Sequence, residues 1–319
     1  MQIFTNTNFD FLRWRWHAIA LSLLVIAAGG YMMATKGLPL GIDFSGGTAF
    51  IIQGASEAEI RRALDAIPGD KVIQQYDDSS KGQILVRLPR PEAGTTVEAQ
   101  AQQVEQTLAS AGLKTTIVGR DLVSAVIGED LQRRGLYATL ASILAITVYI
   151  AIRFRPSFAI GAIAATFHDV FVTLAFLTFF GYDLSLNVVA ALLTITGYSV
   201  NDTIVIFDRV RENLRSMRRQ PLEEVVNISV NQTLSRTVIT AGTTFLSVLA
   251  LFLFGGEALR GFSFTMLVGI VSGTYSTIFI ASAIAIILSR GRRRSAAMAE
   301  PPPAPAQDKG RKPRRARAS

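Results

Sequence analysis

The chain contains no cysteine and only two histidines, and these absences exclude several kinds of functional site. Without thiols it forms no disulfide bond and no thiolate metal site. Two histidines, His17 and His168, are too few for a His-rich metal cluster. The phosphate-binding pattern G-x-x-x-x-G-K-[ST] is also absent, so ATP hydrolysis by that route is not expected. We therefore predict a protein that is not an enzyme and that holds no cofactor and no metal.

Charged residues are scarce, at 18% of the 319 residues, whereas 50% are hydrophobic and the mean hydropathy is +0.35. This composition is typical of a polytopic α-helical membrane protein with one modest domain outside the membrane. The net charge of +8 arises entirely within residues 290–319, which hold ten Lys/Arg and two acids, while the remainder holds 22 of each sign. The basic residues thus belong to a tail, and specific nucleic-acid binding is not expected.

Six apolar runs have about the 17–25 residues that a membrane-spanning helix needs. The predicted spans are residues 17–35, 136–152, 157–180, 184–207, 237–254 and 262–289. Arginines gather before the first span, between the second and third, after the fourth and after the sixth. The positive-inside rule therefore places both ends of the chain, residues 1–16 and 290–319, in the cytoplasm. The first run lacks a small-residue cleavage site, which favours a retained span over a cleaved signal peptide.

The segment between the first two spans, residues 36–135, predicts a small α+β domain on the far side of the membrane. The expected elements are strand 40–53, helix 56–67, strand 71–77, strand 83–89, helix 96–111 and strand 114–119. The order β-α-β-β-α-β is that of a ferredoxin-like fold. A further helical stretch, about 121–134, is expected to lead back to the membrane.

Asp202 lies within the fourth predicted span, where an ionised carboxylate costs about 2.5–3.5 kcal/mol. Such a residue marks a functional site when it has a partner, and Arg236 at the start of the fifth predicted span can supply one. Asn201 and Thr240 belong to polar stripes on the same two helices. The pattern indicates a hydrated proton path in which Asp202 gains a proton when it separates from Arg236. The alternative is a static ion pair that joins two helices.

His168 and Asp169, in the third predicted span, are candidate relay neighbours, and a purely structural role is an equal alternative. Gly269 and Gly273 have the spacing of a close helix–helix contact. The arginine-rich segment near 208–226 predicts an amphipathic helix on the cytoplasmic membrane surface, explained by topology and anchoring. The basic, proline-rich tail predicts solvated disorder, with contact to anionic lipid or ribosomal RNA as the alternative.

Four segments together resemble the SecF family of the bacterial SecD–SecF protein-export complex, and the resemblance covers roughly residues 1–290. Gly41, Asp43, Gly46 and Gly47 belong to the first of them, which also has the simpler interpretation of a glycine-rich turn leading into a strand. The segments are GIDFSGG at 41–47, HDV at 168–170, GYSVNDTIVIFDRVREN at 197–213 and QTLSRTVITAGTT at 232–244.

The resemblance implies half of a resistance-nodulation-division (RND) transporter in the bacterial inner membrane, completed by SecD. It implies that proton flow drives movements of the outer domains, which help an unfolded preprotein to leave the SecYEG channel. Asp202 and Arg236 match the family's proton-relay pair, and a third acid is expected from SecD. Membrane lipid is an expected contact, and YajC and YidC are further candidate partners.

Two alternatives remain at this stage. One is a small-molecule exporter of the same superfamily, which the single small outer domain disfavours because such chains normally carry two large outer loops. The other is a structural subunit that stabilises SecD or the channel and conducts no protons. The paired polar stripes count against this second alternative.

Overall fold

The computed structural model describes residues 7–67, 71–76, 82–88, 96–123 and 125–289, and the predicted tail lies outside this part of the chain. Six of the described helices are long and apolar enough to cross a membrane, which confirms the number of predicted spans. They cover Phe11–Lys36, Gly128–Arg153, Pro156–Phe180, Leu186–Ser216, Leu222–Phe254 and Leu259–Ser289.

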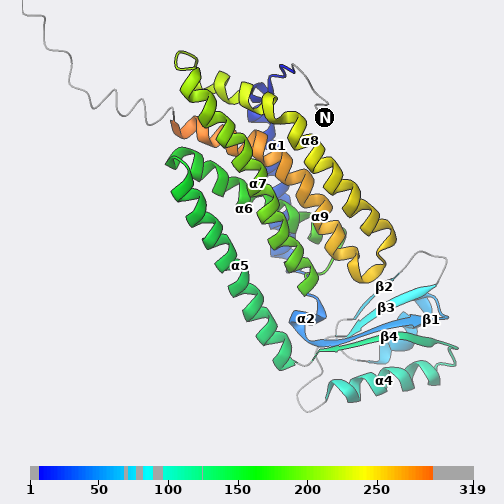
Figure 1. The fold of residues 1–319 in the computed structure, drawn as a ribbon. Coiled ribbons are helices and arrows are strands. Elements are labelled where there is room, and N and C mark those ends of the chain that lie inside the picture. Colours follow the sequence, from blue (N-terminus) through cyan, green and yellow to red (C-terminus); the bar gives the residue numbers. More distant parts are fainter. Residues whose placement is uncertain (1–6, 68–70, 77–81, 89–95, 124, 290–319) are drawn as a thin grey trace, which may run out of the picture.

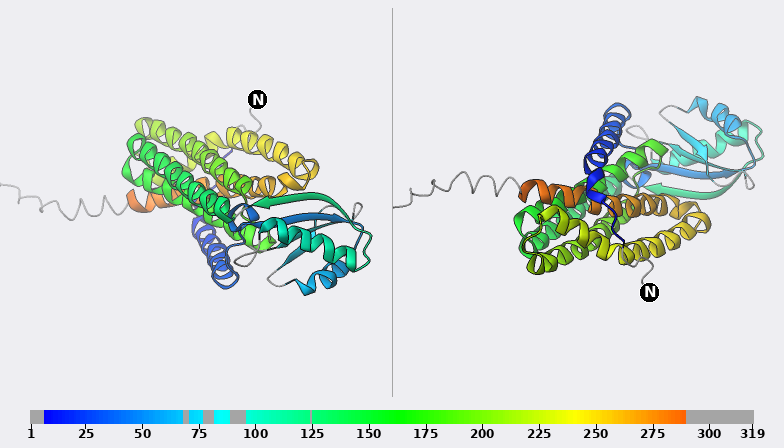
Figure 2. Two further views of the ribbon diagram at one scale, coloured as in Figure 1. Left: turned by 90° about the horizontal axis from the view of Figure 1, so that it is seen from below. Right: turned by 90° about the horizontal axis from the view of Figure 1, so that it is seen from above.

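The outer domain separates α1 from α5, and from α5 onward the elements of the bundle follow one another with short connections (Figure 1). A 3-10 turn, η1, leads into α1, and the last helix, α9, continues into a π-helical segment, η3. Their bounds are η1 Phe11–Trp14, α1 Arg15–Lys36, α5 Ala125–Arg153, α6 Pro156–Phe180, α7 Leu186–Ser216, α8 Leu222–Phe254, α9 Glu257–Ser276 and η3 Thr277–Ala281. Viewed from above and below, α1 lies on one flank of the bundle and α8 on the opposite flank (Figure 2).

Several helices extend well beyond the predicted spans. Helices α7 and α8 have 31 and 33 residues, so at about 1.5 Å per residue they exceed the ~30 Å hydrocarbon layer. The prediction of a separate surface helix near 208–226 is wrong, because residues 208–216 continue α7 and α8 begins at Leu222. Between Leu186 and Pro221 the sequence contains no proline that would end the helix earlier. Likewise, most of the stretch predicted at 121–134 is the beginning of α5.

The outer domain contains a four-stranded antiparallel sheet in the order β2-β3-β1-β4, with connecting helices α3 and α4. This order confirms the predicted ferredoxin-like fold. The bounds are β1 Gly47–Gln53, α3 Glu57–Ala63, β2 Val72–Gln75, β3 Gln83–Leu88, α4 Val97–Ser110 and β4 Thr116–Val123. The first strand begins later than the predicted residue 40, because Ile42–Ser45 form a short helix, α2.

The core of this domain follows from alternation along β1. Phe50 and Ile52 are both 0% exposed and pack in one cluster with Ile60 of α3 and Val104 of α4. Figure 1 shows the domain beyond one end of the membrane bundle, while the first and last described residues lie at the other end. Both ends of the described chain therefore lie at the same end of the helix bundle.

Close helix contacts in the bundle depend on small residues. A Cβ atom added to Gly269 would lie 2.2 Å from the Ile195 side chain, and one on Gly273 would lie 3.0 Å from Ser199. These distances confirm the prediction that this glycine pair allows close approach, here of α9 to α7. A Cβ on Gly161 of α6 would lie 2.5 Å from the Ala281 carbonyl oxygen, at the end of η3.

Candidate functional site in the membrane helices

Asp202 lies midway along α7 and faces α8. Its Oδ1 atom accepts a hydrogen bond of 2.9 Å from the Thr237 hydroxyl, whereas its Oδ2 atom is buried and has no hydrogen-bond partner among the described residues. An unpaired buried polar atom is costly, by about 1–3 kcal/mol, and buried groups of this kind are rare in folded proteins. The Oδ2 atom is therefore an open acceptor for a proton or for a donor from outside the described chain.

The expected contact between Asp202 and Arg236 is not made. No ion pair within 4.0 Å joins them in the described part of the chain, and the Arg236 side chain is exposed. The physical reason is helical geometry, because consecutive residues point about 100° apart and it is Thr237 that points at α7. Sequence reasoning selected the correct turn of α8, and in this structure Thr237 rather than Arg236 makes the hydrogen bond to the carboxylate.

The other predicted members of the polar stripes face outward. Asn201 is exposed on α7, and Thr240 is exposed on α8, where its hydroxyl donates to the Arg236 carbonyl oxygen at 2.8 Å. Thr243 and Ser247 continue the exposed stripe along α8. A polar stripe at membrane depth must face protein or water rather than lipid. This side of α7 and α8 therefore requires a partner or a hydrated space.

Asp169, at the centre of α6, is a buried carboxylate whose two oxygens both accept hydrogen bonds. It is 1% exposed, and three serine hydroxyls donate to it: Ser199 at 2.5 Å, Ser272 at 2.8 Å and Ser276 at 2.8 Å. The Nδ1 atom of His168 lies 3.0 Å from its Oδ1 atom. We call these five residues the Asp169 cluster. The cluster joins α6, α7 and α9 through one carboxylate, which is well stabilised because each oxygen has two partners.

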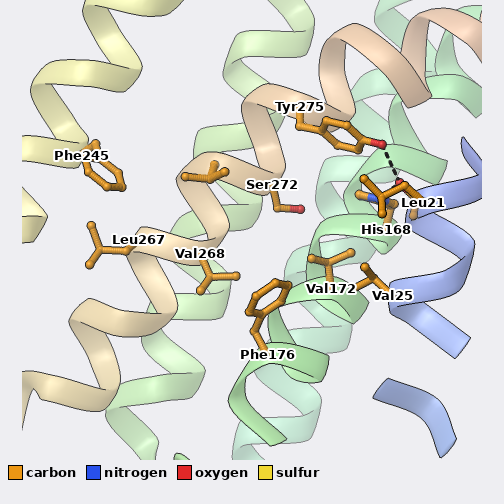
Figure 3. A pocket seen from close by; sticks show the side chains of 12 residues that line it. Leu21, Val25, His168, Val172, Phe176, Phe245, Leu267, Val268, Ser272 and Tyr275 are labelled. Carbon is orange, nitrogen blue, oxygen red and sulfur yellow. Dashed lines mark hydrogen bonds between the residues drawn. The ribbon is translucent and has the colours of Figure 1, made fainter. Parts of the chain in front are cut away.

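The cluster continues through His168 to α1. The Nε2 atom of His168 lies 2.9 Å from the Ser22 hydroxyl, which donates to the Tyr275 hydroxyl at 3.2 Å. Tyr275 in turn donates to the Ala18 carbonyl oxygen at 2.6 Å. Figure 3 shows His168, Ser272 and Tyr275 close together on one side of an otherwise apolar cavity of about 450 Å³ between the helices. This chain of contacts does not include Asp202.

Sequence reasoning missed the serines and the tyrosine of this network. Serine is an ordinary small residue in a membrane helix, so single serines carry little signal. The spacing of Ser272 and Ser276 was the available signal, since residues four apart lie on one face of a helix. Their partner on α6 could be identified only from the packing of α9 against α6.

The glycine-rich segment holds the outer domain against the beginning of α7. The Gly41 N–H donates to the Leu184 carbonyl oxygen at 2.7 Å, and a Cβ on Gly41 would lie 3.0 Å from that oxygen. An Asp43 carboxylate oxygen accepts the N–H of Leu186, the first residue of α7, at 2.9 Å. Asp43 therefore adds a second acceptor to the N-cap Ser185 at the beginning of the helix that carries Asp202, and it complements the positive end of the helix dipole.

The end of the same segment packs on α5. A Cβ added to Gly128 would lie 3.1 Å from the Gly46 nitrogen and from the Phe44 carbonyl oxygen. Gly46 and Gly47 have φ angles of 69° and 130°, which side chains other than glycine rarely adopt. Nearby, Arg87 of the sheet forms an ion pair with Asp183 in the α6–α7 connection. The four predicted motif residues thus form a compact link between the outer domain, α5 and α7.

Comparison with known families gives this architecture its context. Residues 103–291 match the family described as protein export membrane protein SecD/SecF, C-terminal, and residues 31–54 match the SecD/SecF GG motif. The first of these matches covers more than half of the chain. The chain belongs to the SecD/SecF family. The residues of the second match include the glycine-rich link at the beginning of α7.

Individual relatives place the chain with the SecF members of this family. It is 44% identical over 309 residues to the protein translocase subunit SecF of Rhodothermus marinus, covering 93% of this chain and 97% of that one. The SecF subunit of Escherichia coli O157:H7 is 39% identical over 289 residues, with 89% of each chain covered. These matches identify the chain as a membrane subunit of the protein-export type.

Solved structures of the family have the same fold. A crystal structure of SecDF, a translocon-associated membrane protein from Thermus thermophilus, matches with a TM-score of 0.80 and 37% identity over 89% of this chain. A second SecDF structure, in the super-membrane-facing form, matches with a TM-score of 0.69 and 36% identity over 93% of this chain. The chain spans 39% and 41% of those longer chains.

Proposed function

We propose that this chain uses the proton motive force to promote late steps of preprotein translocation through SecYEG, as one half of a complex with SecD. Protons are the coupling ion, unfolded preprotein is the substrate, and YajC and YidC are further candidate partners. The complex lies in the bacterial inner membrane with both ends of this chain in the cytoplasm. The family match and the six membrane helices support this proposal.

One observation carries the proton-coupling part of the proposal. The Oδ2 atom of Asp202 is buried in the middle of a membrane helix without a hydrogen-bond partner in the described chain, and Arg236 lies one residue before its Thr237 donor. With Arg236 swung toward it, the carboxylate is held ionised by the opposite charge, and with Arg236 away it binds a proton. Each charge moved across the membrane field is worth about 2.3 kcal/mol per 100 mV, enough to bias a two-state movement.

The exposed polar stripe supports the need for SecD. Asn201, Arg236 and Thr240 are exposed in the isolated chain although they lie on membrane helices. Helices of a partner subunit would cover them and supply a further acid opposite Arg236. The proton path in this proposal therefore runs between the two subunits, along the faces of α7 and α8.

The glycine-rich link supplies a route from the proton site to the outer domain. Asp43 caps the first turn of α7, and Asp202 lies farther along the same continuous helix. A shift or tilt of α7 on protonation would move its capped end, and with it the base of the sheet. This is a rigid-body coupling between a charge change and a domain movement.

Asp202→Asn tests the proposal, because it preserves the side-chain shape and removes the titratable group. The variant is co-expressed with its SecD subunit, assembly is verified by co-purification, and preprotein export is measured with and without a proton gradient. We expect the gradient-dependent part of export to be lost. The matched control is Glu212→Gln, which neutralises an exposed acid on the same helix that pairs with Arg209.

The control should retain gradient-dependent export. Full gradient stimulation in an assembled Asp202→Asn complex would refute the proton role of Asp202 in this chain.

The Asp169 cluster favours a second, structural function for His168 and Asp169, since both carboxylate oxygens already have partners. In that case Asp169→Asn should affect assembly or stability before it affects proton coupling.

A further inference from the structure

A second cavity, of about 860 Å³, lies at the end of the membrane bundle opposite the outer domain. Its volume falls within the ~300–1,000 Å³ of typical ligand pockets. The cavity lies where α5 ends, α6 begins, α7 ends and α8 begins. Ser289, the last described residue, also lines it. Five arginines line it: Arg153, Arg155, Arg211, Arg215 and Arg218.

The charge of this cavity is only partly neutralised by the described protein. No acidic side chain lines it in the described residues. Arg153 is paired with Asp208, with distances of 2.7 and 3.0 Å to the two carboxylate oxygens. The other four arginines form no ion pair within the described ranges, although the Arg218 side chain donates to the Arg215 carbonyl oxygen at 3.4 Å. Like charges gathered in a concave site attract an anion.

The backbone adds to this positive potential. Helix α6 begins at the cavity, with Arg155 as its N-cap residue, and it has neither a side-chain cap nor an acidic residue in its first turn. Ser157 of that first turn lines the cavity and is buried. The amino-terminal end of a helix carries about half a positive charge and commonly binds phosphate groups.

The deeper surface of the cavity is apolar and aromatic. The Phe207 ring packs edge-to-face against Phe154 and Phe158, with ring centroids 5.9 and 5.1 Å apart. Ile152 of α5 directly precedes Arg153 of the cavity, Ile160 of α6 follows Phe158 by two residues, and their side chains are 82% and 51% exposed. A ligand that combines an anionic group with hydrocarbon would match both parts of the site.

We propose that this cavity binds the phosphate-bearing headgroup of an anionic glycerophospholipid. The arginines and the beginning of α6 hold the phosphate, and the acyl chains leave over the isoleucines into the bilayer. Basic cavities between membrane helices at their cytoplasmic ends are the type of site that anionic lipids occupy. The basic residues 290–319, with a net charge of +8, do not complement an arginine-lined cavity. The proposal uses the cytoplasmic orientation given above but does not depend on proton coupling.

The test measures lipid binding to the full chain purified with its SecD subunit. Native mass spectrometry gives the dissociation constants for phosphatidylglycerol and for phosphatidylcholine with the same acyl chains. The variant Arg211→Gln/Arg215→Gln removes two charges from the cavity, and Arg133→Gln/Arg134→Gln removes two from exposed positions elsewhere on α5. We expect the cavity variant to bind phosphatidylglycerol about 30-fold more weakly, because each of the two arginines contributes roughly fivefold to the affinity.

The control variant should bind phosphatidylglycerol as the unmodified complex does. The proposal is overturned if phosphatidylcholine binds equally well, or if both variants weaken binding to the same extent. A third arm adds inorganic phosphate or ATP in excess. Displacement of the lipid by either would assign the cavity to a soluble phosphate compound and overturn the lipid assignment. Gradient-dependent export by the cavity variant is measured separately, so that a loss of lipid binding can be told apart from a loss of proton coupling through Asp202.

Discussion

Ser276→Ala removes one hydroxyl that donates to the buried Asp169 carboxylate, and it tests whether the Asp169 cluster stabilises the bundle. Ser276 is fully buried and its hydrogen bond to Asp169 is 2.8 Å long. A hydrogen bond to a charged group contributes about 1.5–3 kcal/mol. At about 2.1 cal/mol/K per residue, the entropy of unfolding of this 319-residue chain is about 0.67 kcal/mol/K, so a decrease of about 2–4 °C in the unfolding temperature is expected.

The measurement is thermal unfolding of the detergent-purified chain with its SecD subunit. The matched control is Thr243→Ala, which deletes an exposed hydroxyl that donates to the Ile239 carbonyl oxygen of its own helix at 2.8 Å. We expect the control to change stability by no more than about 0.5 kcal/mol. Equal unfolding temperatures for the two alanine variants would refute the stabilising role of the cluster.

Asp169→Asn then separates the structural role from the relay role that the sequence left open. If the cluster is structural, Asp169→Asn and Ser276→Ala should be non-additive, with a coupling energy of about 0.5–3 kcal/mol, because they remove the same bond. Gradient-dependent export by the assembled Asp169→Asn complex should persist. A variant of unchanged stability that loses this export would instead make Asp169 part of the proton path.

Three further predictions concern single contacts. Asp43→Ala removes the acceptor of the Leu186 N–H, while the N-cap Ser185 remains, so it should destabilise the beginning of α7 by about 0.5–1.5 kcal/mol. Faster amide exchange at this end of α7 would show the effect, and unchanged exchange would refute it. Hydrogen bonds from the backbone N–H and the hydroxyl of Ser56 lower the pKa of Glu59 below its ordinary value of 4.5. The resulting stability is present above pH 4.5 and is lost as the pH falls through the lower pKa of the folded state. Glu59→Gln should remove this pH dependence when the free energy of unfolding is measured against pH. Gly161→Ala should lower the unfolding temperature, since its Cβ would lie 2.5 Å from a carbonyl oxygen at the end of η3, whereas Gly30→Ala meets nothing within 4 Å and should be neutral or slightly stabilising.

Much of the fold could be predicted because it depends on local patterns. Long apolar runs specify membrane helices almost by themselves, since only a helix satisfies its backbone within the bilayer. The six spans and the β-α-β-β-α-β order of the outer domain followed from hydropathy and alternation. The predicted ends of the helices were less accurate, because hydropathy marks only the apolar part of a helix. Helix α7 continues as a polar helix from residue 207 to Ser216.

The candidate site divides in the same way. The sequence by itself identified Asp202 and Asp169, because a carboxylate within an apolar run is conspicuous at any position. Only the tertiary structure decided their hydrogen-bond partners: Thr237 rather than Arg236 donates to Asp202, and three serines from two other helices donate to Asp169. Those partners depend on the rotation and crossing of packed helices, which are long-range properties that no local pattern encodes.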